Sequence, residues 1–229
     1  MNLLEQNIYF SRHYDLSNSL QKNIRTTNTY STLFDSSNKE YVWNINMAKK
    51  FTVNGWLTPI IQGYVGIEEQ QMLGRKFKIV LISRRNHRRV GTRFNSRGID
   101  KEGCVSNMVE TEQILFYDEH YCSYIQVRGS VPLYWNQKGV FSKIKLKRTP
   151  EENYLAATKH FDELIKSYRA ILIFDLLSDK RQGEATLMKV YEEVVEEYQK
   201  ATGANIKYCN IDFHRETAVS VVNHNRKEI

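Results

Sequence analysis

The stretch "FSKIKLKRTPEEN" (Phe141–Asn153) decides how the fold is interpreted, because a strand pattern gives way to a helix start within it. In its first half, the apolar residues Ile144 and Leu146 alternate with three lysines. This period-two pattern is typical of a strand with one buried face. The opposite face would carry only lysine side chains, so we expect it to be exposed and cationic.

The second half of the same stretch predicts the N-terminus of an α-helix. Thr149 is a suitable N-cap, Pro150 suits the first helical position, and Glu152 stands where it can close a capping box. Mostly apolar residues then recur at helical spacing: Tyr154, Thr158, Phe161, Leu164, Ile165 and Tyr168. The sequence therefore changes from strand to helix near residues 147–150.

On the N-terminal side of this change, the apolar runs predict strands. The clearest are "FKIVLIS" (Phe77–Ser83), "QILFY" and "SYIQV". On the C-terminal side, "AILIFDLL" and "IKYCNIDF" read as strands, and a second helix is expected from about Glu184 to Thr202, with Gly203 at its end. We therefore predict an α+β chain with a β-rich region at 1–148, followed at 149–229 by the start of an α/β region with a parallel component.

The composition is that of a packed, globular protein. The chain has 229 residues, of which 41% are hydrophobic, with only 3 Pro and 11 Gly. The N-terminus has no secretory signal pattern, and no run approaches 18 apolar residues. Three widely spaced cysteines suggest free thiols in a reducing compartment, and no Cys/His cluster has zinc-ligand spacing. We expect neither a metal nor a cofactor.

Positive charge is concentrated in one segment. Of the 33 Lys and Arg residues, nine lie between Arg75 and Arg97 with no acidic residue among them, and the remaining 24 are outnumbered by the 26 Asp and Glu residues. A local excess of this kind attracts polyanions such as nucleic acid, anionic lipid or phosphorylated small molecules. The alternative is a solvated, arginine-rich loop without a partner.

Two windows match the Cys-X5-Arg spacing of cysteine-dependent phosphatases: "CSYIQVR" (Cys122–Arg128) and "CNIDFHR" (Cys209–Arg215). Such a loop must turn its backbone N–H groups inward around phosphate, which favours glycine and small residues, and a helix should follow it. Both windows instead hold aromatic and β-branched residues that prefer an extended backbone. We predict that both cysteines lie in strands, and we assign no catalytic residue within the chain.

Longer blocks carry a family resemblance. "HRRVGTRFNSRGIDKEGCVSNMVETEQIL" (His87–Leu115), followed by "YIQVRGSVPLYWNQ" (Tyr124–Gln137), resembles the Sac-domain phosphoinositide phosphatases, which include the synaptojanins. The most specific parts are the Asn-X-X-Glu-Thr-Glu-Gln block at Asn107–Gln113 and the Arg-Gly-Ser-X-Pro-X-X-Trp block at Arg128–Trp135. Weaker likeness extends in order over most of residues 8 to 217.

The resemblance implies an enzyme that removes phosphate from the inositol rings of membrane lipids. In that family the reaction uses a Cys-X5-Arg loop that follows the segment resembling "IDFHRE". We therefore expect this chain to be a central portion of a Sac domain. Region 1–148 would be incomplete at its start, and region 149–229 would begin the phosphatase-like catalytic part without its loop. The chain alone is then expected to be inactive, which leaves its own classification as an enzyme open. The alternative is a non-catalytic, Sac-like lipid-binding or scaffold protein.

The resemblance also selects residues for substrate or membrane contact. Within the expected cationic surface we choose Arg93, Arg97 and Arg128, because arginine forks suit phosphate groups beside an anionic membrane. For Arg97 and Arg128 the alternative is a turn-stabilising hydrogen bond or an ion pair with Glu110 or Glu112.

Other residues of the blocks are expected to be structural. Asn107 and Thr111 should fix backbone geometry, Trp135 should lie in the core rather than anchor a membrane, and Asp212 and His214 should share a structural hydrogen bond. The expected partners are phosphoinositide lipids and an anionic membrane surface, not nucleic acid, since no nucleic-acid module is recognisable. We expect a cytoplasmic protein that is peripheral at membrane surfaces.

Overall fold

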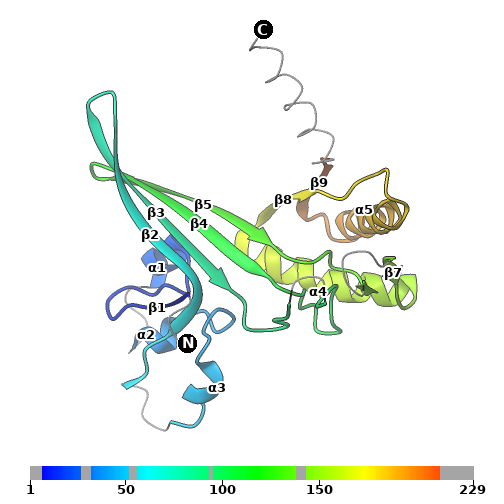
Figure 1. Cartoon of the computed structure of the whole chain (residues 1–229), viewed down its shortest axis with the longest axis horizontal. Coiled ribbons are helices and arrows are strands. Elements are labelled where there is room, and N and C mark those ends of the chain that lie inside the picture. The colour runs from blue at the N-terminus through cyan, green and yellow to red at the C-terminus, as the bar shows by residue number, and fades with distance from the viewer. Residues whose placement is uncertain (1–6, 27–31, 52–55, 93–94, 138–142, 212–229) are drawn as a thin grey trace. The chain divides into compact units, whose positions relative to one another are not determined.

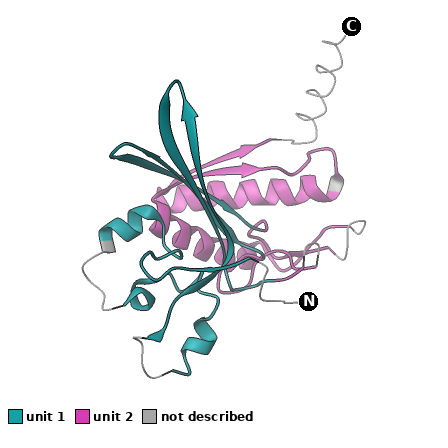
Figure 2. Ribbon diagram, turned by 60° about the vertical axis from the view of Figure 1, so that its left-hand side comes forward, with its two compact units in different colours: residues 1–90, 107–129 teal, residues 91–106, 130–229 magenta. Residues whose placement is uncertain are grey.

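The computed structural model describes residues 7–26, 32–51, 56–92, 95–137 and 143–211 (Figure 1). They form two compact units: residues 1–90 with 107–129, and residues 91–106 with 130–229 (Figure 2). The division expected at residues 148–149 stays a prediction about domains. The chain enters the second unit for good after Gly129, and the second unit also takes in residues 91–106, which include the end of the basic region.

The first unit is built on a five-stranded antiparallel sheet with the strands in chain order. The strands are β1 (Ile8–Phe10), β2 (Ile60–Met72), β3 (Arg75–Arg85), β4 (Val109–Tyr117) and β5 (His120–Arg128). Each of the three strands predicted from apolar runs is confirmed, and each is longer in the structure than its run. Most residues of these extensions are charged or polar, so they lie outside the apolar runs.

Three short helices accompany this sheet: α1 (Leu20–Thr26), α2 (Leu33–Ser36) and α3 (Ile45–Ala48). Leu20 at the start of α1 packs with Ile61, Ile82 and Ile114, which come from three neighbouring strands. Since these four side chains are at most 9% exposed, they form the core beneath the sheet. A smaller cluster around Phe34 holds α2 and α3 together.

The sheet requires a glycine at one point of close approach. Gly63 of β2 pairs with Arg84 of β3, and a Cβ atom at residue 63 would lie 1.8 Å from the backbone oxygen of Ser83. No side chain fits there without a shift of the neighbouring strand. Gly63 also donates its N–H to the carbonyl of Asn7, which ties the N-terminal edge to β2.

The second unit alternates helices and strands, as the sequence predicts. It contains α4 (Pro150–Tyr168), β8 (Ala170–Asp175), α5 (Gln182–Thr202) and β9 (Asn205–Asn210), and β8 pairs in parallel with β9. The α/β character and its parallel component are therefore confirmed. The first turn of α5 begins at Gln182, two residues before the expected start.

The helix boundaries follow the predicted caps. The Thr149 hydroxyl accepts from the Glu152 N–H at 3.2 Å, and Glu152 accepts from the Thr149 N–H at 3.1 Å, which completes the capping box. Gly203 ends α5 with φ +66°, the left-handed conformation that favours glycine. Both helices bury an apolar stripe, centred on Phe161 of α4 and Leu187 of α5.

The lysine-rich stretch at residues 141–147 forms a shorter strand than expected. Within the described residues only β7 (Lys145–Leu146) is extended and paired, with β6 (Trp135–Asn136) as its partner. The predicted alternation nevertheless holds, because Ile144 and Leu146 pack against the core while the lysines at 143, 145 and 147 are exposed. Residues 141 and 142 lie outside the described part.

Candidate functional site

The basic segment from Arg75 to Arg97 divides between a strand and a loop. Its first five cations lie on β3, so the interpretation of the whole segment as a solvated loop is wrong for the part up to Arg85. Arg84 does not contribute to the expected cationic surface, because its side chain is completely buried. The alternation of a strand explains this, because successive side chains point to opposite faces and one face is covered.

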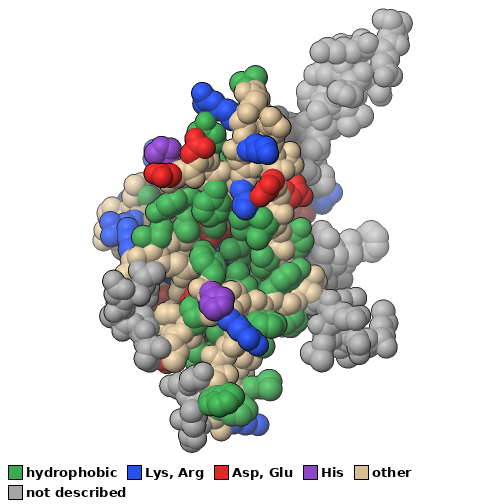
Figure 3. Space-filling view, turned by 90° about the vertical axis from the view of Figure 1, so that its left-hand side faces the viewer, with side chains coloured by type: hydrophobic (Ala, Val, Ile, Leu, Met, Phe, Trp, Pro, Cys, Tyr) green, Lys and Arg blue, Asp and Glu red, His purple; other side chains and the backbone are tan. Residues whose placement is uncertain are grey.

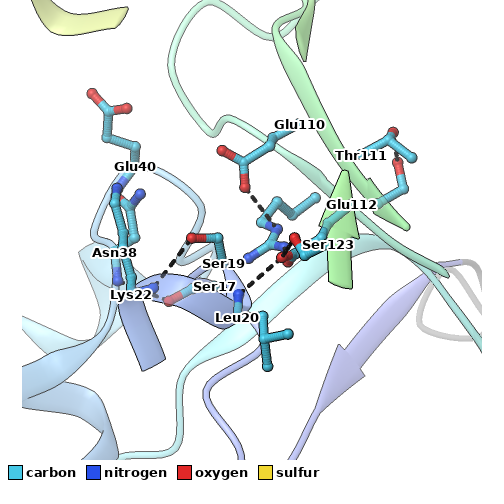
Figure 4. Close-up of polar contacts among 12 residues, drawn as sticks. Ser17, Ser19, Leu20, Lys22, Asn38, Glu40, Glu110, Thr111, Glu112 and Ser123 are labelled. Carbon is cyan, nitrogen blue, oxygen red and sulfur yellow. Dashed lines mark hydrogen bonds and ion pairs between the residues drawn. The ribbon is translucent and has the colours of Figure 1, made fainter. Parts of the chain in front are cut away.

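Arg84 lies between two carboxylates of the neighbouring strand (Figure 4). Its Nε atom is 3.2 Å from Oε1 of Glu110, and its Nη2 atom is 2.5 Å from Oε2 of Glu112. All three side chains are buried, with exposed fractions of 0–4%. Two carboxylates compensate the positive charge of a guanidinium that would otherwise be very costly to bury, although Nε and Nη1 of Arg84 have no hydrogen-bond partner among the described residues.

Glu112 also connects elements that are distant in the sequence (Figure 4). Its Oε1 atom accepts from the Leu20 backbone N–H at 2.9 Å and from the Ser123 hydroxyl at 2.6 Å. One carboxylate therefore joins the N-terminus of α1 to β3, β4 and β5. The acceptor at the first turn of α1 also satisfies an N–H that has no partner within the helix.

Two further polar residues of the Asn107–Gln113 block, Asn107 and Thr111, contact side chains of β3. Asn107 has φ +55°, and its side-chain oxygen accepts from Arg85 at 2.6 Å. The Thr111 hydroxyl lies 3.0 Å from the hydroxyl of Ser83 on the paired strand. Both contacts are with side chains, and the expectation that Asn107 and Thr111 fix backbone geometry stays a prediction.

A second buried polar cluster precedes α1, and the sequence reasoning missed it. Asp15, 3% exposed, accepts from the Ser17 N–H at 2.9 Å, from the Ser17 hydroxyl at 2.6 Å and from Asn18 at 2.9 Å. The Ser17 oxygen in turn accepts from the Asn38 N–H at 2.8 Å (Figure 4). The signal was available in "DLSNS", since Asp followed by Ser two residues later is typical of a side-chain–backbone turn.

The Arg128–Trp135 block supports the start of the second unit. Trp135 is 9% exposed and packs in the core, so its predicted core position is confirmed. The Arg97 guanidinium lies over the Trp135 ring, 5.4 Å from its centre, and the Ser130 hydroxyl accepts from the Gly98 N–H at 2.8 Å. Arg97 is accordingly a half-buried residue oriented by an aromatic ring.

The three predicted contact arginines have different positions. Arg128 is exposed at the end of β5, opposite Val109 of β4. Arg97 belongs to the second compact unit and Arg128 to the first, whereas Arg93 lies outside the described residues. The carboxylates considered as alternative ion-pair partners, Glu110 and Glu112, both bind Arg84.

The cysteine windows are extended where the structure describes them. Cys122 is an exposed residue of β5 opposite Leu115, and Cys209 is a half-buried residue of β9 opposite Phe174. Both predicted strand positions are confirmed. The first window cannot form an anion nest in this conformation, because the N–H groups of a strand alternate in direction. Residues from Asp212 onward, including His214, lie outside the described part.

Two side chains of the second unit with strongly shifted pKa values, His160 and Tyr208, also have structural partners. Burial lowers the pKa of His160 to about 4, and the carbonyl of Gly103, 3.2 Å from Nδ1, only partly opposes this shift. Burial and Asp175 raise the pKa of Tyr208, whose hydroxyl donates to that carboxylate at 2.5 Å. At neutral pH both side chains are uncharged hydrogen-bond donors. In the described residues, no group of three or more His, Cys, Asp or Glu side chains could hold a metal ion.

Comparisons with known proteins give one consistent answer. The family model described as SacI homology domain matches residues 1–218. Phosphatidylinositol-3-phosphatase SAC1-B of Danio rerio is 34% identical over 219 residues, covering 91% of this chain and 36% of the relative. Phosphatidylinositide phosphatase SAC2 of Homo sapiens is 30% identical, covering 91% of this chain and 21% of the relative.

A third relative is similarly related over a shorter span. Inositol-1,4,5-trisphosphate 5-phosphatase 1 of Schizosaccharomyces pombe is 36% identical over 204 residues, covering 81% of this chain and 19% of the relative. In these three comparisons the chain spans 36% or less of the relative's length. Among the helices that the structure describes, none is long and apolar enough to cross a bilayer.

Proposed function

The chain belongs to the SacI homology domain family, and on this basis we propose that it is part of a phosphoinositide phosphatase, which hydrolyses phosphate monoesters on inositol lipids. The family match over residues 1–218 carries the proposal, and the relatives are named as phosphatases of phosphoinositides or of an inositol phosphate. In the proposed enzyme, the nucleophile comes from a Cys-X5-Arg loop other than the two windows that begin at Cys122 and Cys209. This chain supplies a framework and cationic contacts.

We assign the headgroup contact first to Arg128. Its side chain is exposed at the end of β5, and a guanidinium presents two parallel N–H donors to one phosphate. Arg93 and Arg97 remain part of the same proposal. The Trp135 ring beneath the Arg97 guanidinium restricts its orientation, which reduces the entropy lost on binding. The protein would work in the cytoplasm, peripherally at an anionic membrane.

Vesicle flotation tests the headgroup contact. Phosphatidylcholine vesicles containing phosphatidylinositol 4-phosphate are compared with vesicles of equal charge containing phosphatidylserine. We expect the 229-residue chain to prefer the phosphoinositide, and Arg128→Gln to weaken that binding about fivefold, as for one basic residue at an anionic surface. Lys207→Gln is the matched control, because it removes a cation from an exposed strand position of β9. Equal binding to both vesicle types would contradict the assignment.

Phosphate release separates catalysis from binding. We expect the 229-residue chain alone to release no inorganic phosphate from phosphatidylinositol 4-phosphate, because Cys122 and Cys209 lie in strands. Release that Cys122→Ser abolished would overturn this expectation. The same strand positions favour a second candidate, a non-catalytic Sac-like protein that binds lipid or a protein partner. Phosphoinositide binding without hydrolysis by the complete gene product would support that candidate.

A further inference from the structure

The long hairpin formed by β2 and β3 ends in an apolar turn. Met72 is 64% exposed and Leu73 is 93% exposed, the highest exposure among the large hydrophobic side chains that the structure describes. Leu73 and Gly74 form a two-residue turn with φ values of +51° and +76°. Such turns favour Asn, Asp or Gly at the first position, because a branched side chain is strained at positive φ. Folding alone gives no reason for a leucine here.

The turn extends beyond the neighbouring hairpin. In the register of the sheet, Lys78 pairs with Phe116, close to the end of β4, whereas β2 and β3 continue to the pair Met72–Arg75. Because β4 ends at Tyr117, one residue past Phe116, β2 and β3 extend about two residues of strand further than β4 and β5, which corresponds to about 7 Å. Figure 1 shows this end of the hairpin standing clear of the helices of its own unit.

Positive charge follows directly behind the apolar turn. Arg75 and Lys76 are both exposed, and the next cation, Lys78, is paired with Glu69 at 3.2 Å. The turn between β4 and β5 is acidic, at Asp118–Glu119. Because β4 and β5 end before β2 and β3 do, this acidic turn does not reach the level of Met72 and Arg75. Figure 3 looks onto the side that carries the hairpin ends; the hydrophobic side chains gather mainly in the middle of this face, and Lys, Arg, Asp and Glu side chains lie toward its upper part.

We propose that the hairpin end, Met72–Lys76, is a membrane-insertion site for a bilayer with anionic headgroups. Met72 and Leu73 enter the boundary between headgroups and acyl chains, where apolar side chains leave water. Arg75 and Lys76 contact lipid phosphates at the level above. A protruding two-residue turn suits a bilayer better than a protein, because a stable protein interface needs about 800 Å² on each partner.

This site is separate from the proposed headgroup contact, because it includes none of the arginines 93, 97 and 128. Its lipid partner needs only a negative surface, so it can be measured without any phosphoinositide. The probe is therefore a set of phosphatidylcholine vesicles with and without phosphatidylserine, added to the 229-residue chain and sedimented.

The decisive variant is Leu73→Asn, because asparagine suits a turn with positive φ and the hairpin should fold at least as well. We expect the lipid concentration for half-maximal binding to rise about tenfold or more, since the buried area of one leucine is lost. Leu155→Gln is the matched control: it removes a 62% exposed leucine from α4, at a position that suits glutamine, and should leave binding unchanged. Lys76→Gln should weaken binding about fivefold, only on vesicles with phosphatidylserine.

Three results would overturn the proposal. They are binding by Leu73→Asn equal to that of the unmodified chain, an equal loss in Leu155→Gln, or a dimer in ultracentrifugation without lipid that Leu73→Asn dissociates. The last result would assign the turn to a second copy of the chain. Arg128→Gln separates the two proposals, because it should lose the preference for phosphoinositide over phosphatidylserine and keep the Leu73-dependent binding.

Discussion

The buried cluster of Arg84, Glu110 and Glu112 offers the sharpest test of how the first unit is stabilised. In Glu112→Ala, Arg84 would lose its 2.5 Å partner, and the Leu20 N–H and the Ser123 hydroxyl would lose their common acceptor. The Arg84 side chain and the Leu20 N–H are buried, whereas the Ser123 hydroxyl is part-buried. Water therefore cannot replace the contacts of Arg84 and Leu20 without opening the structure.

The expected loss is large because the site is buried. Arg84 keeps Glu110 as a partner, but three donors lose their acceptor at about 1–3 kcal/mol each, so we expect a loss of about 3–5 kcal/mol in unfolding free energy. For a chain of this size, that corresponds to a fall in melting temperature of about 6–20 °C. Glu112→Gln keeps an oxygen for Leu20 and Ser123 and loses only the charge, so its loss should be smaller than that of the alanine variant.

Urea unfolding followed by far-ultraviolet circular dichroism measures these losses. The matched control is Glu69→Ala, which removes a carboxylate from the same sheet. Its pair with Lys78 is exposed, at 75% and 46% of the two side chains, so the expected cost is about 0–1 kcal/mol. If Glu112→Ala and Glu69→Ala lose equal stability, the buried cluster does not hold the unit together as argued.

Two further outcomes follow from individual contacts. Gly63→Ala should cost about 3 kcal/mol or more in unfolding free energy, measured with urea, because its Cβ would meet the Ser83 backbone oxygen at 1.8 Å. The control is Gly74→Ala, whose Cβ would have no atom within 4 Å and which should cost about 1 kcal/mol for its positive φ. Equal costs of the two substitutions would refute the clash at Gly63. His160 is protonated in the unfolded chain below pH 6.5 but in the folded protein only near pH 4, so its contribution to stability is full above pH 6.5 and is lost as the pH falls from 6.5 to 4. His160→Asn, which keeps a donor for the Gly103 carbonyl, should flatten stability over that pH range, and an unchanged slope would show that another group causes it.

Local patterns predicted the second unit better than the first. The Thr149 cap, Pro150 and Gly203 act within a few residues of the chain, so their effect is visible in the sequence and the structure reproduces it. The parallel pairing of β8 with β9 followed from the alternation of helix and strand. The compact units were not predicted, because residues 91–106 join the second unit through contacts such as that of Gly103 with His160, 57 residues apart.

The exposure of the charged residues at the candidate site could not be predicted from the sequence. The resemblance identified the right blocks, but a charge excess in the sequence does not say which cations are exposed. Arg84 lies in the middle of the basic segment, and only the register with β4 reveals that it faces Glu110 across the sheet. Arg97 was expected in a cationic surface, and it is half-buried against Trp135, 38 residues away.

The buried cluster also changes how the basic segment and the Asn107–Gln113 block are interpreted. In Asn107–Gln113 the carboxylates of Glu110 and Glu112 point to one face of β4 and Thr111 to the other. A strand with two acids on its covered face needs a buried cation, and the adjacent basic strand supplies Arg84. Part of the basic segment and the acidic block therefore form one folding unit. The excess positive charge available to a membrane or a phosphoinositide must then be sought in the exposed cations, which is why Arg128 and the hairpin end at Arg75 and Lys76 are the positions to test.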